Sequence, residues 1–185
     1  EAERAVVFIG PFEHHSNELP WVESVADVVE IGLDGRGGVN LDELRAQLER
    51  YADRPLKIGS FSAASNVTGV FSDVGAIAEV LHQGGAYACF DYAAGGPYMP
   101  IDMQRMDALF LSTHKFIGGP QASGILVANR ALFRCRTPER PGGGTVEYVS
   151  AASPDAIDYT ERLDEREEGG TPAIMSDVRA GTAFL

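Results

Sequence analysis

Cysteine is scarce in this sequence, which has only Cys89 and Cys135 among its 185 residues. Two cysteines cannot form a disulfide framework, and alone they cannot complete a zinc site. The four histidines include no i, i+4 pair and the sequence has no CxxC, so it predicts no metal site. Cysteine usage favours a reducing compartment, and we therefore expect a cytoplasmic protein.

The sequence also lacks an excess of basic residues and long apolar runs. Lys and Arg number 15 against 27 Asp and Glu, which gives a net charge of −12. A chain of this charge repels the phosphate backbone of nucleic acids and contains no basic stripe, so we expect neither nucleic acid nor an anionic membrane surface as a partner. No apolar run approaches the ~20 residues of a membrane span. The sequence shows no basic segment followed by an apolar one, the pattern of a secretory leader, so we do not expect a secreted protein.

Hydrophobic residues make up 44% of the sequence and charged residues 23%, a composition typical of one globular domain with a real core. Apolar, β-branched segments alternate with helical patterns that begin at Ser16, Asn40 and Ser72, all good N-cap residues. The predicted helices extend to residues 26, 52 and 81, and the predicted strands cover 4–9, 28–31, 56–62, 86–91, 108–112 and 123–128. Continuously apolar strands indicate an α/β fold of three layers, with helices on both faces of a mainly parallel sheet.

Polar residues cluster where these strands end, which is where ligands bind in such sheets. Asp91 closes the apolar segment AYACF, and a carboxylate there needs a cation or hydrogen-bond donors, unless it is only a cap or turn residue. Lys115 follows ALFLSTH and is a candidate for Schiff-base chemistry, or else a solvated loop lysine. Comparable positions are held by His14, His15, Asn66, Ser112 and His114.

Other common catalytic signatures are missing. The glycine-rich segments GLDGRGG, GGPQASG and GGGT match neither a P-loop nor a dinucleotide-binding fingerprint, and no GxSxG is present. Cys89 lies inside a predicted strand and is expected to be a small core residue, whereas Cys135 has no evident base nearby.

Taken together, the motifs resemble one family, the class V aminotransferases, which are pyridoxal-phosphate enzymes of fold type I. Five segments in register carry this resemblance: FEHHSNELPW (12–21), SAASNVTG (62–69), FDYAAG (90–95), LSTHKFIGGPQASGIL (111–126) and EEGGTPAI (167–174). The resemblance implies the fold type I architecture and the cofactor pyridoxal 5'-phosphate. Residues 1–185 would then be the central part of the large, cofactor-binding domain of a longer protein.

The resemblance also implies a role for each matching residue. Lys115 would form the Schiff base with the cofactor and, once freed, move the substrate Cα proton, which requires a partly desolvated amine. Asp91 would pair with the pyridinium nitrogen and His14 would stack on the ring, which makes these three the catalytic set. Asn66 would bind the phenolic oxygen of the ring. The phosphate would be contacted by Ser112, His114 and, from the neighbouring subunit of a homodimer, Thr171.

Within the family, the motifs EHHSN and STHK favour a cysteine desulfurase or selenocysteine lyase-like enzyme acting on an amino acid. A class V transaminase, or another β-lyase or epimerase, is the alternative, and an inactive dimerisation module is an alternative of another class. Ala94 stands where the desulfurase-like pattern has Gln, so Asn66 would bind the ring oxygen alone or with help from Tyr92 or a water. His15 and Asn17 are expected to be helix-start or supporting residues. The polar, Gly/Pro-rich segment 138–171 would form the dimer interface.

Overall fold

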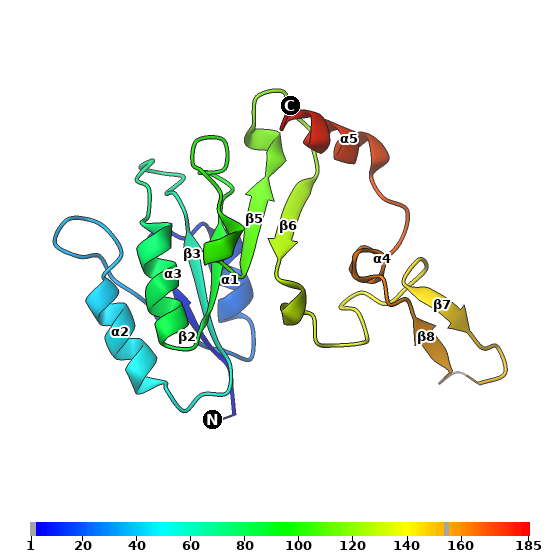
Figure 1. Ribbon diagram of the computed structural model, residues 1–185, viewed down its shortest axis with the longest axis horizontal. Helices are drawn as coiled ribbons and strands as arrows, with labels where there is room; N and C mark the ends of the chain where they lie inside the picture. Colours follow the sequence, from blue (N-terminus) through cyan, green and yellow to red (C-terminus); the bar gives the residue numbers. More distant parts are fainter. Residues whose placement is uncertain (1–2, 154–155) are drawn as a thin grey trace.

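The computed structural model describes residues 3–153 and 156–185 and contains a six-stranded sheet (Figure 1). Its order is β2-β1-β3-β4-β5-β6; neighbours from β2 to β5 run parallel, and β6 is antiparallel to β5. The strands are β1 (Val6–Ile9), β2 (Asp27–Glu30), β3 (Lys57–Ser62), β4 (Tyr87–Asp91), β5 (Ala108–Ser112) and β6 (Gly124–Ala128). The mainly parallel α/β sheet predicted from the apolar strands is confirmed.

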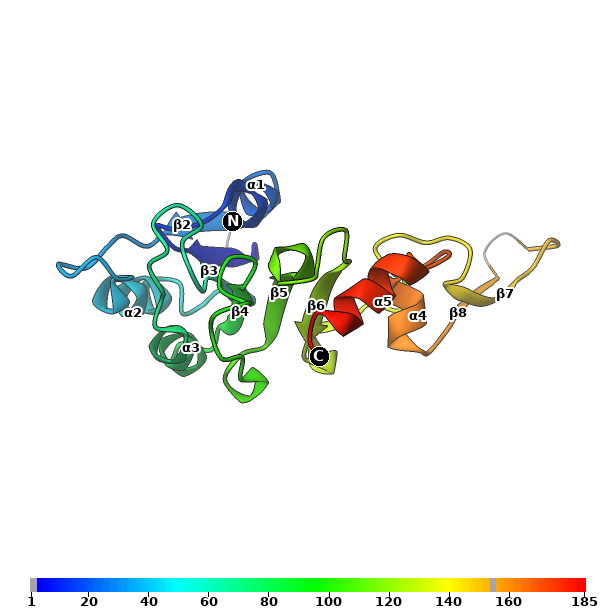
Figure 2. The same ribbon diagram turned by 90° about the horizontal axis from the view of Figure 1, so that it is seen from above.

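Helices lie on both faces of the sheet, but they cover the two faces unequally (Figure 2). Helices α2 (Leu41–Arg50) and α3 (Val74–Gln83) pack on one face, and α1 (His15–Val22) lies on the other. The core therefore sits between the sheet and α2 and α3, where Leu44, Phe61 and Leu81 are fully buried. On the α1 face, Phe110 of β5 and Leu126 of β6 remain 39% and 52% exposed.

The helix starts differ from the prediction at two of three places. Asn40 caps α2 as expected, with its side chain accepting from Glu43 N. Helix α1 begins two residues earlier than an N-cap at Ser16 predicts, because the His14 ring takes that role, and it ends at Val22. Asp73 caps α3, since the Ser72 hydroxyl donates instead to the carbonyl of Ser62 at 2.7 Å. A histidine ring nitrogen can replace an Asx oxygen as a cap acceptor, and residue type alone does not reveal this.

The polar segment 138–171, which the sequence predicts to be an interface segment, has secondary structure of its own. It contains the antiparallel pair β7 (Val146–Val149) and β8 (Ile157–Tyr159) and the short helix α4 (Leu163–Glu167), while residues 154–155 lie outside the described residues. These elements lie beyond β6, away from β1 to β4, and α5 (Ile174–Thr182) follows them (Figure 1). The described part of the chain also contains three short 3-10 helices: η1 (Met103–Arg105), η2 (Thr113–Lys115) and η3 (Arg130–Leu132). No helix among residues 3–153 and 156–185 is long and apolar enough to span a membrane.

The close packing of β3 against α3 gives a first prediction. A Cβ atom added at Gly59 would lie 2.3 Å from Cδ1 and 2.9 Å from Cγ of Leu81, whose side chain is fully buried. We expect Gly59→Ala to lower the free energy of unfolding by about 1–3 kcal/mol, the usual cost of overpacking. Gly35→Ala is the control, because nothing lies within 4 Å of an added Cβ there. Urea unfolding of both variants measures the difference, and equal stabilities would contradict the prediction.

Candidate functional site

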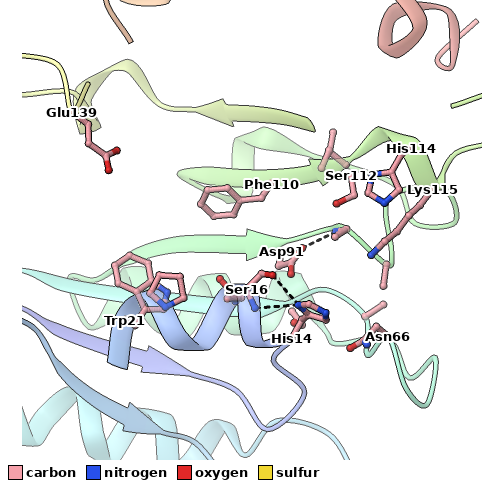
Figure 3. Close-up of a pocket in the computed structure, with 17 residues that line it drawn as sticks. His14, Ser16, Trp21, Asn66, Asp91, Phe110, Ser112, His114, Lys115 and Glu139 are labelled. Carbon is pink, nitrogen blue, oxygen red and sulfur yellow. Dashed lines mark hydrogen bonds between the residues drawn. The ribbon is translucent and has the colours of Figure 1, made fainter. Parts of the chain in front are cut away.

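A cavity of about 870 Å³ opens at the carboxyl ends of β3, β4 and β5, beside the first turn of α1. Six of the seven residues predicted for the site line it (Figure 3): His14, Asn66, Asp91, Ser112, His114 and Lys115. Thr171, the seventh, is exposed and lies outside the cavity lining. The parallel sheet brings these residues together from positions far apart in the sequence, because each lies at or after the end of a strand and these strands end at the same edge.

Asp91 is the last residue of β4, where it stands in register between Ser62 of β3 and Phe110 of β5. Its side chain is half-buried, and Oδ1 accepts a hydrogen bond from the backbone N–H of Ala93 at 2.7 Å. No ion pair within the described part of the chain includes Asp91. The site therefore presents a partly desolvated carboxylate that can accept from a cationic donor in the cavity.

Lys115 ends the single turn of η2, directly after β5. Two contacts fold this turn: the buried Thr113 hydroxyl donates to the carbonyl of Ser123, and Phe116 N donates to the carbonyl of Thr113 at 3.0 Å. Gly119 is required nearby, because an added Cβ there would lie 2.0 Å from the Thr113 carbonyl oxygen. The Lys115 side chain points into the cavity (Figure 3) but is exposed, so the described residues do not provide the desolvation that was expected for its amine.

His14 is fixed by its own helix start. Its Nδ1 accepts from the backbone N–H of Ser16 at 3.1 Å and lies 3.1 Å from the Ser16 hydroxyl (Figure 3). Because Nδ1 accepts, the neutral ring carries its proton on Nε2. The His14 ring is thus held at the cavity with Nε2 as its hydrogen-bond donor.

The remaining predicted residues differ in exposure. Asn66 and His114 are exposed, and Ser112 is half-buried at the end of β5. Tyr92 is 2% exposed and packs in the core, outside the cavity lining, so it does not assist Asn66. Ala94 does line the cavity and offers only a methyl group there.

Sequence reasoning gave no role to Glu13, whose carboxylate is the centre of a buried network. Its Oε1 accepts from the N–H groups of Gly10 and Ser62 at 3.1 and 2.8 Å. Its Oε2 accepts from Ser62 Oγ at 2.8 Å and from Asn17 Nδ2 at 2.5 Å. Asn17, expected only to support the helix start, is 7% exposed and also accepts from Ser60 Oγ at 2.7 Å. The only sequence signal was a carboxylate placed just after a buried strand.

Burial raises the pKa of the Glu13 carboxyl above its ordinary value of 4.5, although its hydrogen bonds with Asn17, Ser62 and Gly10 oppose the shift. A carboxyl whose pKa is higher in the folded state favours folding less as the pH rises from 4.5 through that raised pKa. We therefore expect the stability of the wild type relative to Glu13→Gln to fall across this window in urea unfolding.

Asp34 provides the control of opposite sign. The N–H groups of Gly38 and Arg36 lower the pKa of this exposed carboxyl below 3.8. The Asp34 carboxylate stabilises the folded state above pH 3.8, and this stabilisation is lost as the pH falls through the lowered pKa. The free energy of unfolding of the wild type should therefore fall relative to that of Asp34→Asn on acidification. Slopes of the same sign for the two pairs would contradict one of the two assignments, and the sign itself would show which.

The two cysteines lie outside the cavity lining. Burial, assisted by the charge of Asp107, raises the pKa of the Cys89 thiol to about 12. Cys89 is therefore a neutral core residue at physiological pH, as its place inside a strand predicted, whereas Cys135 is exposed.

Curated proteins similar to this chain are consistent with the geometry. A probable cysteine desulfurase from Halalkalibacterium halodurans is 31% identical over 185 residues, covering 96% of this chain and 43% of the relative. Another from Aeropyrum pernix is 34% identical over 178 residues, covering 93% of this chain and 42% of the relative. The chain thus spans less than half the length of these relatives.

Solved structures agree on the fold. A cysteine desulfurase from Thermococcus onnurineus superposes with a TM-score of 0.81 at 26% identity, covering 99% of this chain and 45% of the other. The cysteine desulfurase CsdA from Escherichia coli gives a TM-score of 0.83 at 24% identity, covering 98% and 45%. The family model for class-V aminotransferases, which are pyridoxal-phosphate enzymes, matches residues 2–184. This chain therefore belongs to the class-V aminotransferase family.

Proposed function

We propose that the full-length protein is a pyridoxal-phosphate-dependent enzyme that acts on an amino acid, of the cysteine desulfurase type. The observation that carries the proposal is the convergence of Asp91 and Lys115 on one cavity. The residues fit the cofactor: a half-buried carboxylate without an ion-pair partner in the described chain suits a protonated pyridine nitrogen, and a primary amine suits an aldehyde. The similarity to proteins named cysteine desulfurases supports the choice of subgroup.

When bound, the cofactor supplies an electron sink for the bonds at the substrate Cα. Asp91 would keep the ring nitrogen protonated, and His14 would stack on the ring face with Nδ1 held by Ser16. Asn66 would donate to the phenolic oxygen, while Ser112 and His114 would donate to the phosphate. Lys115 would hold the cofactor covalently and, after the substrate amine replaces it, carry the Cα proton on Nζ.

We also propose a cytoplasmic homodimer in which segment 138–171 lies at the interface. Thr171 is exposed and outside the cavity of its own chain, which suits a residue that reaches the phosphate of a neighbouring subunit. The β7–β8 pair exposes Tyr148 and Val149, as an interface segment would. A Thr171→Val variant should weaken cofactor binding only in the dimer, which sedimentation and cofactor titration together can measure.

A class V transaminase or another β-lyase is the second candidate. One observation favours it: Ala94 lines the cavity where the desulfurase-like pattern has Gln, and it offers only a methyl group there. A panel of amino acids separates these reactions by their products, because a desulfurase releases alanine and sulfur and a transaminase releases a keto acid.

The test of the proposal is to add pyridoxal phosphate to the full-length protein and follow the visible absorption band. Borohydride reduction should then fix the label on Lys115, which peptide mapping can identify, and Lys57, the other lysine among residues 1–185, should stay unlabelled. A label on another residue would overturn the proposal. If no band forms, the alternative of an inactive dimerisation module is favoured.

A further inference from the structure

The Glu13 carboxylate joins two parts of the chain that the proposed function treats separately. Ser62 donates to it twice from the carboxyl end of β3, Gly10 donates from the end of β1, and Asn17 donates from the first turn of α1. Gly10 makes room for this arrangement, since an added Cβ there would lie 2.8 Å from Glu13 Oε1. All four hydrogen bonds come from neutral donors, and no ion pair within the described residues includes Glu13. The carboxylate is therefore a bridge rather than half of a salt bridge.

The bridge lies next to a cavity residue. His14 follows Glu13 directly and caps α1, so the place of its ring depends on where the first turn of that helix sits. Ser16 sets the orientation of the ring through a contact within the helix start, but this contact moves with the helix and cannot place it. The hydrogen bonds from Ser62 and Ser60, more than forty residues away, connect the helix start to the sheet.

We propose that Glu13 is a positioning residue that holds His14 at the cavity by tying the first turn of α1 to the end of β3. It touches neither the cavity nor a ligand, because the cavity lining includes His14, Asn17 and Ser62 but not Glu13. The inference deepens the proposed function and rests on it wherever cofactor binding is the readout. A second, cofactor-free readout tests the placement of His14 itself.

Three variants of the full-length protein separate positioning from general stability. Glu13→Ala removes all four acceptor contacts. Glu13→Gln keeps the length and one oxygen for the N–H groups of Gly10 and Ser62. Its amide can donate to Asn17 once that side chain flips, which gives up only the long 3.4 Å hydrogen bond from Asn17 Nδ2 to the Ser60 carbonyl. Glu43→Ala is the matched control: Glu43 Oε2 accepts from Gly32 N at 2.9 Å, on helix α2 across the sheet from the cavity.

The first readout is the ¹⁵N chemical shifts of the His14 ring nitrogens in cofactor-free protein. We expect them to change in Glu13→Ala, to remain near wild type in Glu13→Gln, and not to respond to Glu43→Ala. The second readout is the dissociation constant for pyridoxal phosphate. We expect it to rise roughly tenfold or more in Glu13→Ala, as for other residues that orient a binding group, and to be largely restored in Glu13→Gln.

Thermal unfolding checks that each variant is folded, and we expect Glu43→Ala to lose stability without losing cofactor affinity. The proposal is overturned if folded Glu13→Ala keeps wild-type His14 shifts, or if Glu43→Ala disturbs His14 as much as Glu13→Ala does. If the wild type binds no cofactor, the proposed function fails while the ring shifts still decide the role of Glu13. If the cofactor binds but the shifts do not respond, only the positioning role fails.

Discussion

Lys115→Ala is expected to abolish both turnover and the borohydride-reducible label of the full-length protein. Proton transfer by a positioned side chain alone contributes typically 10²–10⁴-fold to a rate. Because Lys115 would supply both this transfer and the covalent attachment, we expect activity to fall by roughly 10⁴-fold or more. The side chain is exposed, so the fold should be unaffected and the free energy of unfolding should change by no more than about 0.5 kcal/mol.

Lys57→Ala is the matched control for this experiment. Lys57 opens β3, at the end of the strand away from the cavity, and its Nζ donates to the carbonyls of Ala52 and Arg54 at 3.3 Å. This variant should keep the label, the absorption band and turnover. Turnover of Lys115→Ala within tenfold of wild type, or loss of the label in Lys57→Ala, would contradict the assignment of Lys115.

The sheet was predictable because its signal is local and strong. Segments such as Val6–Ile9 are continuously apolar and buried at every position, and such strands need no other information to be recognised. The cavity followed from the sheet, since the polar residues after β3, β4 and β5 must meet at one edge. Features that depend only on one strand and the residues that follow it were therefore predictable from the sequence.

Contacts between distant segments were not predictable in the same way. Glu13 and Ser62 are 49 residues apart, and no spacing rule connects a glutamate before a helix with a serine that closes a strand. The N-cap of α3 was predicted wrongly for a related reason. Ser72 is a good N-cap residue, but its hydroxyl donates to the carbonyl of Ser62, so Asp73 caps the helix instead. The exposure of Lys115 likewise depends on what surrounds η2, which the local sequence does not contain.

Asp91→Ala is expected to abolish lyase or transaminase turnover while leaving the fold largely intact. A buried charge that loses its partner typically costs 3–5 kcal/mol, and each ~1.4 kcal/mol is a factor of ten in rate. If Asp91 holds the proton of the ring nitrogen, its loss should lower turnover by roughly 10²–10⁴-fold. Asp91→Asn sharpens the test: the amide oxygen can still accept from Ala93 N–H, which Oδ1 now accepts at 2.7 Å, but the charge is gone.

Asp91→Asn should thus match wild type in thermal unfolding and match Asp91→Ala in activity. Asp107→Asn is the control, because Asp107 also caps a backbone N–H, that of Ala88 at 2.8 Å, but at the amino end of β5, away from the cavity. It should retain turnover even if its contact with His82 is weakened. Asp91→Asn activity within a few-fold of wild type would mean that the carboxylate only closes the turn after β4, and that the cavity needs no negative charge from this residue.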